Sequence, residues 1–453
     1  MSLTPRQLVL AALRRESIAR TPWVPYVGCH GGKLLHLPAS TYLRDPEYIA
    51  SGVATAAERY RADGLPVVFD LQVEAEALGC ALMWSDDNPP AVHSHPLAEG
   101  VALADLPPLT PESARLPVVL EAIRRSRARV GDEVALFGLV TGPFTLALHL
   151  LGSDIFMDMV LDADRVHALL AYTSGVATQV ARWYREAGCD VIAAVDPMTS
   201  QISPAHFREF VSPAAAPLFA AVRASGAASA FFVCGDARRN LEAMCETGPD
   251  SVFVDEQIDL VEMRGIAERH RVAFGGNIPL TSVLLLGTPD DARRAAQQCL
   301  AAGGAPGYLL APGCDMPYDT RPENLVAVAE VVHGEFRGTV AAAAAAAPEV
   351  ELPDYEQPDL VRVEIFTLDS AACAPCQYMV EAVRAILPEF GPRVTWTEHK
   401  LRTDITPPLM GALGVRSIPS IAIDGVVHFA SIIPEADRLR SAITERLAAK
   451  AGS

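Results

Sequence analysis

Five residues that can do chemistry stand at or just after the ends of short apolar runs: Asp70, Asp196, Cys234, Asn277 and Cys314. A carboxylate can orient a substrate or move a proton, and a thiolate can act as a nucleophile or bind a metal. A polar residue at a strand end is also common as a turn or helix cap. If the runs are parallel strands of a barrel, their carboxyl ends meet at one mouth, where the active sites of barrels lie. We therefore expect these side chains to face one site.

A second group of reactive residues lies near the carboxyl terminus, where Cys373 and Cys376 form a Cys-x-x-Cys motif at the expected start of a helix. The partial positive charge of a helix N-terminus lowers the pKa of the first cysteine of such a pair. Cys373 is therefore the expected nucleophile and Cys376 the expected resolving thiol. A zinc site is the alternative, but it needs two more ligands, for which His399 and His428 are the candidates.

The elements that would position the first group are eight short apolar runs separated by segments with helical periodicity. The runs are Trp23–Gly28, Pro66–Leu71, Val134–Val140, Asp190–Val195, Ala228–Cys234, Ser251–Asp255, Val272–Gly276 and Tyr308–Ala311, and two of the helical segments are Pro204–Ala224 and Thr288–Ala302. Fully apolar strands that alternate with helices indicate a parallel sheet. Eight of them over this length favour a closed (β/α)8 barrel, a TIM barrel, over an open sheet.

The chain divides at an alanine-rich stretch. Residues 341–347 are seven alanines, and a segment rich in proline and glutamate follows, which is typical of a linker. We therefore expect a barrel over residues 1–337, a linker over 338–358 and a small α/β domain over 359–453. In this domain the sequence predicts strands at Val361–Thr367, Val394–His399, Ser420–Ile423 and Val426–Ala430, and helices from the Cys-x-x-Cys motif to about Leu387, at Pro407–Leu413 and at Glu435–Ala448.

The composition is that of a globular protein, since 50% of the 453 residues are hydrophobic and 20% are charged. The net charge of −18 argues against nucleic acid and against an anionic membrane surface as partners. Nine cysteines are an ordinary density, and we expect most to be reduced, as in the cytoplasm. The N-terminus lacks the pattern of a signal peptide. The apolar stretch 134–151 is broken by Thr141-Gly142-Pro143, so it predicts a buried strand and helix instead of a membrane span.

Four strings in the first part of the chain resemble the uroporphyrinogen decarboxylase superfamily, which has a (β/α)8 fold. They are the opening Thr-Pro-Arg-Gln-Leu-Val-Leu-Ala-Ala-Leu, the run from Asp196 to Phe210, Gly275-Gly-Asn277, and the run from Leu310 to Asn324. The resemblance covers residues 1–337.

The superfamily has two main branches. Porphyrin decarboxylases carry an Arg-rich loop near the N-terminus, and the matching region here, Thr21–Lys33, contains no arginine. Methyltransferases of the other branch move methyl groups between a corrinoid and a thiol, and they bind zinc through a His-x-Cys pair and a cysteine in a Pro-Gly-Cys turn. Cys234 and Cys314 match these two cysteines. The resemblance therefore implies a zinc ion that turns a bound thiol into a thiolate.

The sequence departs from this pattern at Phe232, which occupies the place of the family's histidine two residues before Cys234. Three interpretations stay open. The zinc site is rebuilt with His30 or with Glu74, it binds metal weakly, or Cys234 and Cys314 are free thiols that serve a different chemistry.

Four residues without a metal-binding role are candidates for the same mouth, three of which stand at or just after the ends of apolar runs. In the superfamily an aspartate after the matching strand faces the mouth, which makes Asp70 a catalytic candidate. Asp196 is the second catalytic candidate, either orienting a substrate or capping the helix that follows. Tyr26 and Asn277 are the expected substrate-binding residues.

The small domain resembles the thioredoxin and glutaredoxin family. The resemblance rests on Cys373-Ala-Pro-Cys376 and on Gly414-Val-Arg-Ser-Ile-Pro419, which occur in the family's order. It implies that Pro419 is in cis, lies opposite the cysteine pair and shapes a surface for a peptide or thiol. A thioredoxin fold without redox activity is the alternative.

These features together favour a methyltransferase that moves a methyl group between a corrinoid and a thiol or small substrate, with a fused dithiol redox domain. The sequence contains no Asp-x-His-x-x-Gly string, so the corrinoid would come on a separate partner protein. The other partner would be a small-molecule thiol or methyl donor. A metal-independent decarboxylase or lyase is one alternative, which requires cations in the mouth. A non-catalytic carrier or sensor of a metal or a methylated thiol is the other.

Overall fold

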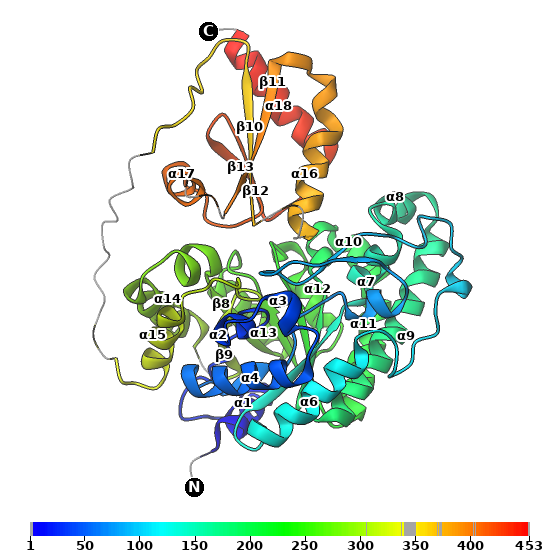
Figure 1. Ribbon diagram of the computed structural model, residues 1–453, viewed down its shortest axis with the longest axis vertical. Coiled ribbons are helices and arrows are strands. Elements are labelled where there is room, and N and C mark those ends of the chain that lie inside the picture. The colour runs from blue at the N-terminus through cyan, green and yellow to red at the C-terminus, as the bar shows by residue number, and fades with distance from the viewer. Residues whose placement is uncertain are drawn as a thin grey trace. The chain divides into compact units, whose positions relative to one another are not determined.

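The computed structural model describes residues 3–336 except 305, residue 338, and residues 350–451 except 369, 371–373, 402 and 404. The chain forms two compact units, Met1–Val340 and Ala341–Ser453 (Figure 1). Most of the expected linker, together with Cys373, lies outside the described residues.

The first unit is built around a curled, all-parallel sheet of seven strands in the order β1-β4-β5-β6-β7-β8-β9. The strands are β1 (Gly64–Pro66), β4 (Ala135–Thr141), β5 (Val191–Val195), β6 (Ala228–Val233), β7 (Ser251–Val254), β8 (Ala273–Ile278) and β9 (Tyr308–Pro312). A separate hairpin pairs β2 (Leu82–Met83) with β3 (Ala91–Val92). Nearly every strand residue of the seven-stranded sheet is buried, as a parallel sheet covered on both faces requires.

The segment expected to form the first strand makes only an isolated parallel bridge between Trp23 and Leu310. The carbonyl of Trp23 accepts from the amide of Asp63, just before β1, and the amide of Val24 donates to the carbonyl of Leu310 in β9. The segment therefore connects the two edges of the sheet. The prediction of a regular strand here is wrong because Pro25 has no amide hydrogen with which to continue the ladder.

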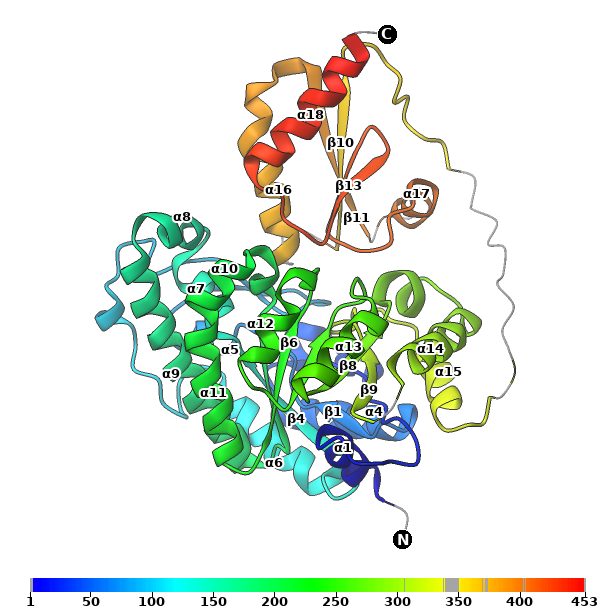
Figure 2. The same cartoon turned by 180° about the vertical axis from the view of Figure 1, so that it is seen from behind.

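Helices surround this sheet: most lie on its outer side, and the first of them lies at the end where the strands begin. They are α1 (Pro5–Leu13), α2 (His30–Leu34), α3 (Ala39–Tyr42), α4 (Pro46–Tyr60), α5 (Val73–Ala77), α6 (Leu116–Val130), α7 (Pro143–Leu151), α8 (Asp154–Leu161), α9 (Ala163–Ala187), α10 (Pro204–His206), α11 (Ser212–Ala224), α12 (Leu241–Glu246), α13 (Leu260–His270), α14 (Pro289–Gly303) and α15 (Pro322–Val332). Helix α9 packs against β4 and β5, α11 against β6, α12 against β7, α13 against β8, and α14 against β8 and β9 (Figures 1 and 2). The predicted helix 288–302 is found as α14, which begins with a capping box at Thr288.

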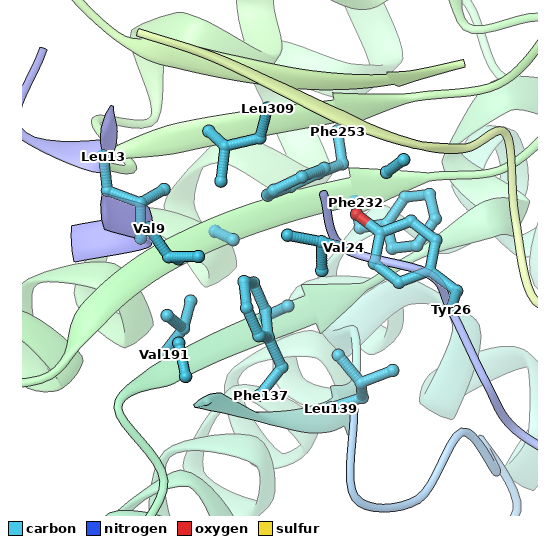
Figure 3. Packing of buried hydrophobic residues seen from close by; sticks show 14 of the residues in the cluster. Val9, Leu13, Val24, Tyr26, Phe137, Leu139, Val191, Phe232, Phe253 and Leu309 are labelled. Carbon is cyan, nitrogen blue, oxygen red and sulfur yellow. The ribbon is translucent and has the colours of Figure 1, made fainter. Parts of the chain in front are cut away.

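The concave side of the sheet is filled by apolar side chains. Alternate residues of the strands point inward, among them Phe137, Phe232 and Phe253, and Tyr26 packs with them (Figure 3). Helix α1 adds Val9 at the end where the strands begin. Each of these large side chains contributes about 1.5–3 kcal/mol by leaving water, so the interior is a packed core and not a channel.

No single helix among the described residues is long and apolar enough to cross a membrane, although the bent pair α7 and α8 meets the criteria by length and composition. The apolar stretch 134–151 forms β4 and α7, as expected from the sequence, and every residue of both elements is buried.

The second unit contains a four-stranded mixed sheet in the order β11-β10-β12-β13. The strands are β10 (Val361–Thr367), β11 (Val394–Lys400), β12 (Ser420–Ile423) and β13 (Val426–Ala430), and the helices are α16 (Ala374–Ile386), α17 (Thr406–Leu413) and α18 (Ala436–Ala451). These bounds are close to those predicted from the sequence. Asp424 and Gly425 both have positive φ angles, 45° and 75°, and they form the tight turn that joins β12 to β13.

Candidate active site at the carboxyl ends of the strands

Two cysteines meet at the mouth of the seven-stranded sheet. Cys234 directly follows β6, and Cys314 follows the end of β9 by two residues. They are joined by a disulfide bond with a Cα–Cα distance of 5.8 Å. Both are partly exposed, and both pack on the inward-facing core. The parallel strands thus bring together two thiols that are 80 residues apart in the sequence.

An acidic pair at the end of β7, Asp255 and Glu256, lies between the two cysteine turns. The amide of Gly235 donates to Asp255 Oδ2 at 2.9 Å, and a Cβ atom on Gly313 would lie 2.6 Å from the amide nitrogen of Glu256. Burial, reinforced by the charge of Asp255, raises the pKa of Glu256 to about 8, so this carboxyl keeps its proton at neutral pH. The sequence placed the pair at a strand end but assigned it no role.

Phe232 belongs to the core below the cysteines. Its ring centroid lies 4.9 Å from that of Tyr26, 5.8 Å from that of Phe69 and 6.0 Å from that of Phe253. The hydroxyl of Tyr26 is buried and finds no hydrogen-bond partner among the described residues. Phe232, at the position where the resemblance implies a histidine, therefore makes only apolar ring contacts.

His30 and Glu74, the two proposed substitute ligands, are both committed to other protein groups. His30 Nδ1 donates to the carbonyl of Tyr318 at 2.9 Å, so Nε2 accepts from the hydroxyl of Tyr60 at 2.7 Å. Burial lowers the pKa of His30 to about 4, which keeps the ring neutral. The two oxygens of Glu74 accept from the amide and the hydroxyl of Thr141 at 3.0 and 2.7 Å.

A zinc ion in a catalytic site takes three protein ligands and one open position. Within the described ranges, no group of three or more His, Cys, Asp or Glu residues is arranged to hold a metal ion. The two thiols are bonded to each other, and Phe232 offers no ligand atom. The residues present therefore do not fit the zinc ion that the resemblance implies, and no step of the reaction is assigned to a metal.

Asp70 forms a buried ion pair beside the mouth. Arg115 Nη1 donates to Asp70 Oδ2 at 2.6 Å, and Arg115 Nε donates to Glu76 Oε2 at 2.5 Å. The remaining nitrogen of Arg115, Nη2, is buried without a hydrogen-bond partner in the described part of the chain. The sequence missed Arg115 because this residue lies just before α6, far from Asp70 in the chain.

Asp196 and Asn277 hold backbone in place. Asp196 accepts from the amides of Phe144 and Thr145 at 3.1 and 2.7 Å and from the hydroxyl of Thr145 at 2.6 Å. It thereby caps α7, and burial raises its pKa to about 6. The amide group of Asn277 donates to the carbonyls of Asp255 and Ile258 at 2.9 and 2.6 Å. Asn277 therefore fixes the loop that carries the acidic pair.

In the second unit, Cys376 is buried in the first turn of α16 and is disulfide-bonded. Cys373 falls outside the described residues. The peptide bond between Ile418 and Pro419 is cis, as expected, and Pro419 directly precedes β12.

A cavity of about 440 Å³ lies at the opposite end of the sheet from the cysteines. Residues at the starts of β6 and β7 line it together with α1, and its charged lining includes Arg6, Arg14, Arg185, Arg223 and Asp190. It is therefore separate from the cysteine site, because parallel strands start and end at opposite faces.

Comparisons with known proteins agree on the first unit. The family profile "Uroporphyrinogen decarboxylase (URO-D)" matches residues 4–335. A methylcobamide:CoM methyltransferase, MtbA of Methanosarcina acetivorans, is 27% identical over 335 residues, which cover 72% of this chain and 97% of the relative. The uroporphyrinogen decarboxylase of Anaeromyxobacter dehalogenans is 30% identical over 343 residues, which cover 72% of this chain and 97% of the relative.

Among solved structures, a methyltransferase from Methanosarcina mazei superposes with a TM-score of 0.68 at 26% identity, covering 74% of this chain and 99% of that one. Its fold thus spans the first unit and leaves the second unmatched. Together these matches show that the chain is a methyltransferase-like enzyme that belongs to the uroporphyrinogen decarboxylase (URO-D) family.

Proposed function

We propose that this enzyme transfers a methyl group between a corrinoid, carried by a separate protein, and a small thiol. The observation that carries the proposal is the position of Cys234 and Cys314 at the carboxyl ends of β6 and β9, where barrel enzymes bind their substrates. The names of the matched methyltransferases, which pair a methylcobamide with CoM, support a corrinoid as one partner.

The chain's own part in this reaction is to bind and orient the thiol and, in the fraction of molecules whose Glu256 carboxyl is ionised, to accept its proton. The corrinoid would supply a methyl group bound to cobalt, which a thiolate sulfur attacks in line. A free thiol has a pKa of about 8.5, and the carboxyl of Glu256 has a pKa of about 8. Proton exchange between the two groups is therefore nearly balanced in free energy. The Nη2 of Arg115 finds no hydrogen-bond partner among the described residues, but it is buried and its guanidinium lies over the ring of Trp84, so it can meet an anionic group of the substrate only if the mouth opens around it.

The second unit is proposed to be a thioredoxin-like domain over residues 359–453, joined through a linker over 338–358 to the TIM-barrel-like domain over 1–337. Its strand order, the position of Cys376 in the first turn of α16 and the cis peptide before Pro419 support this proposal. Cys373 would attack a disulfide, and Cys376 would resolve the mixed disulfide. Five free cysteines in the first unit support a compartment that keeps thiols reduced, such as the cytoplasm.

Decarboxylation is the second candidate function, and Arg115 is the observation that favours it. A buried guanidinium at the mouth can hold a substrate carboxylate, and a decarboxylase is among the matched relatives. Against this, Asp70 and Glu76 already neutralise Arg115. Methyl transfer therefore remains the first proposal.

The experiment is a methyl-transfer assay on anaerobically purified full-length protein with methylcobalamin and a panel of small thiols. We expect a methyl thioether to form with at least one thiol, at a rate that falls tenfold or more in Cys234→Ser. Cys245→Ser is the matched control, because Cys245 is buried in α12 and should leave the rate unchanged. Release of carbon dioxide from a porphyrinogen, without methyl transfer to any thiol, would favour the decarboxylase instead.

A further inference from the structure

The cysteines of the first unit fall into two classes. Cys29, Cys80, Cys189, Cys245 and Cys299 are all buried and unpaired. Burial raises the pKa of each of these thiols, for example to about 12 in Cys80 and about 11 in Cys299, so they are inert. Cys234 and Cys314 are partly exposed and bonded to each other. Among the described cysteines of this unit, Cys234 and Cys314 are therefore the two whose sulfurs a thiol in solution can reach.

The surroundings of the pair supply no third metal ligand in the described part of the chain. The inward position below Cys234 is filled by Phe232, which packs against three aromatic rings. Two neighbouring carboxylates are held by backbone amides: Asp255 accepts from Gly235 and Gln257, and Asp315 accepts from Gly28. The mouth thus contains two sulfurs, and the carboxylate of Asp255 beside them is occupied by hydrogen bonds from backbone amides.

The backbone holds the two cysteines in place independently of the bond between them. The turn after β6 is fixed by the hydrogen bond from Gly235 to Asp255, and the turn after β9 is fixed by the amide of Gly313, which donates to the carbonyl of Ile278 at 3.0 Å. The Cα–Cα distance of 5.8 Å is ordinary for a disulfide. The bond can therefore open and close without a rearrangement of the strands.

We propose that Cys234 and Cys314 form a reversible, redox-active disulfide in this enzyme, in place of a metal–thiolate site. In the reduction step, one thiolate of an incoming dithiol attacks one sulfur of the pair, and the other sulfur leaves as a thiolate. The second thiolate of the dithiol then displaces the mixed disulfide. Two electrons pass from the dithiol to the pair, the dithiol becomes a disulfide, and both cysteines end as thiols. This proposal goes beyond methyl transfer and does not depend on it.

The test equilibrates the anaerobic full-length protein in buffers with graded ratios of reduced to oxidised dithiothreitol. Free thiols are then alkylated, and the fraction of bonded Cys234 and Cys314 is measured by peptide mass spectrometry. Zinc is measured in the same reduced samples after incubation with zinc and removal of the excess. We expect both cysteines to titrate together in one two-electron transition, and we expect far less than one zinc per chain.

The matched variant is Phe232→His, which introduces an imidazole two residues before Cys234 and beside the ring of Tyr26, whose hydroxyl has no hydrogen-bond partner within the described residues. That hydroxyl can hydrogen-bond the new ring, which helps the variant to fold. We expect it to bind about one zinc per chain and to shield both cysteines from alkylation. The wild-type measurement decides the question even if the variant does not fold. One zinc per reduced wild-type chain that is lost in Cys234→Ser and Cys314→Ser would overturn the proposal, as would a pair that stays reduced at every ratio.

Discussion

Removing the bond between Cys234 and Cys314 should destabilise the first unit by an amount set by the length of chain that the bond closes. The two cysteines are 80 residues apart. By the loop-closure estimate, a cross-link of that span restricts the unfolded chain by about 4.5 kcal/mol at room temperature, while natural disulfides usually contribute about 2–5 kcal/mol. We therefore expect the Cys234→Ser/Cys314→Ser double variant to lose about 3–4.5 kcal/mol of unfolding free energy.

Urea unfolding followed by tryptophan fluorescence measures this loss. The chain's tryptophans are Trp23, Trp84 and Trp183 in the first unit and Trp396 in the second, so a Trp396→Phe background makes the fluorescence report on the first unit alone. Omitting reductant keeps the disulfide of Cys376 the same in every variant.

The two single serine variants serve as controls. Each of them breaks the same bond, so both should match the double variant to within about 0.5 kcal/mol. A loss below about 1 kcal/mol in all three variants would refute the reasoning, because a cross-link of this span would then not restrain the unfolded chain.

Three further predictions concern charged groups and the second unit. Glu256→Gln should flatten the pH dependence of stability. Burial raises the pKa of Glu256 to about 8 in the folded protein, whereas the unfolded chain releases this proton near pH 4.5. The wild-type unfolding free energy should therefore fall between about pH 4.5 and about pH 8, by at most about 1.4 kcal/mol per pH unit. Urea unfolding at a series of pH values checks this. Asp70→Asn should lower the unfolding free energy, measured with urea, by about 3 kcal/mol because it leaves the buried charge of Arg115 only partly neutralised. The control Arg129→Gln breaks an exposed ion pair and should lower the unfolding free energy by less than about 1 kcal/mol. Cys376→Ser should leave Cys373 without its resolving thiol, so that glutathione disulfide modifies Cys373 as a stable mixed disulfide, detectable by peptide mass spectrometry without reductant; no such adduct would argue against a nucleophilic Cys373.

The sequence predicts most of the parallel strands well because each is buried on both faces and is therefore apolar throughout. The prediction Pro66–Leu71 is wrong, since β1 spans Gly64–Pro66. Val134–Val140 and Tyr308–Ala311 are found almost unchanged as β4 and β9. The failure at Trp23–Gly28 has a local cause, since an apolar run shows where a segment is buried but not whether its amides can continue a ladder. Pro25 removes the amide that a strand there would need.

The site is harder to predict because its contacts are made between residues far apart in the chain. The strand ends correctly indicate where chemistry-bearing residues gather. They do not show that Arg115 neutralises Asp70, that Asp196 is occupied in capping α7, or that Asn277 is occupied in holding a loop. The cis peptide before Pro419 was predicted, because a local string of residues carries it.

The chemistry of the mouth depends on one inward-facing position. A histidine at position 232 would place a nitrogen ligand below Cys234, and a metal could then hold both sulfurs as thiolates. With Phe232 in that place, the sulfurs of Cys234 and Cys314 can bond to each other or to an incoming thiol. If the pair is redox-active as proposed, the enzyme needs a supply of reducing equivalents, and a reduced Cys-x-x-Cys motif tethered to the same chain would be present at high effective concentration. On that proposal, Phe232 at the mouth and the Cys-x-x-Cys motif have a common explanation in sulfur exchange, which separate metal and redox sites would not provide.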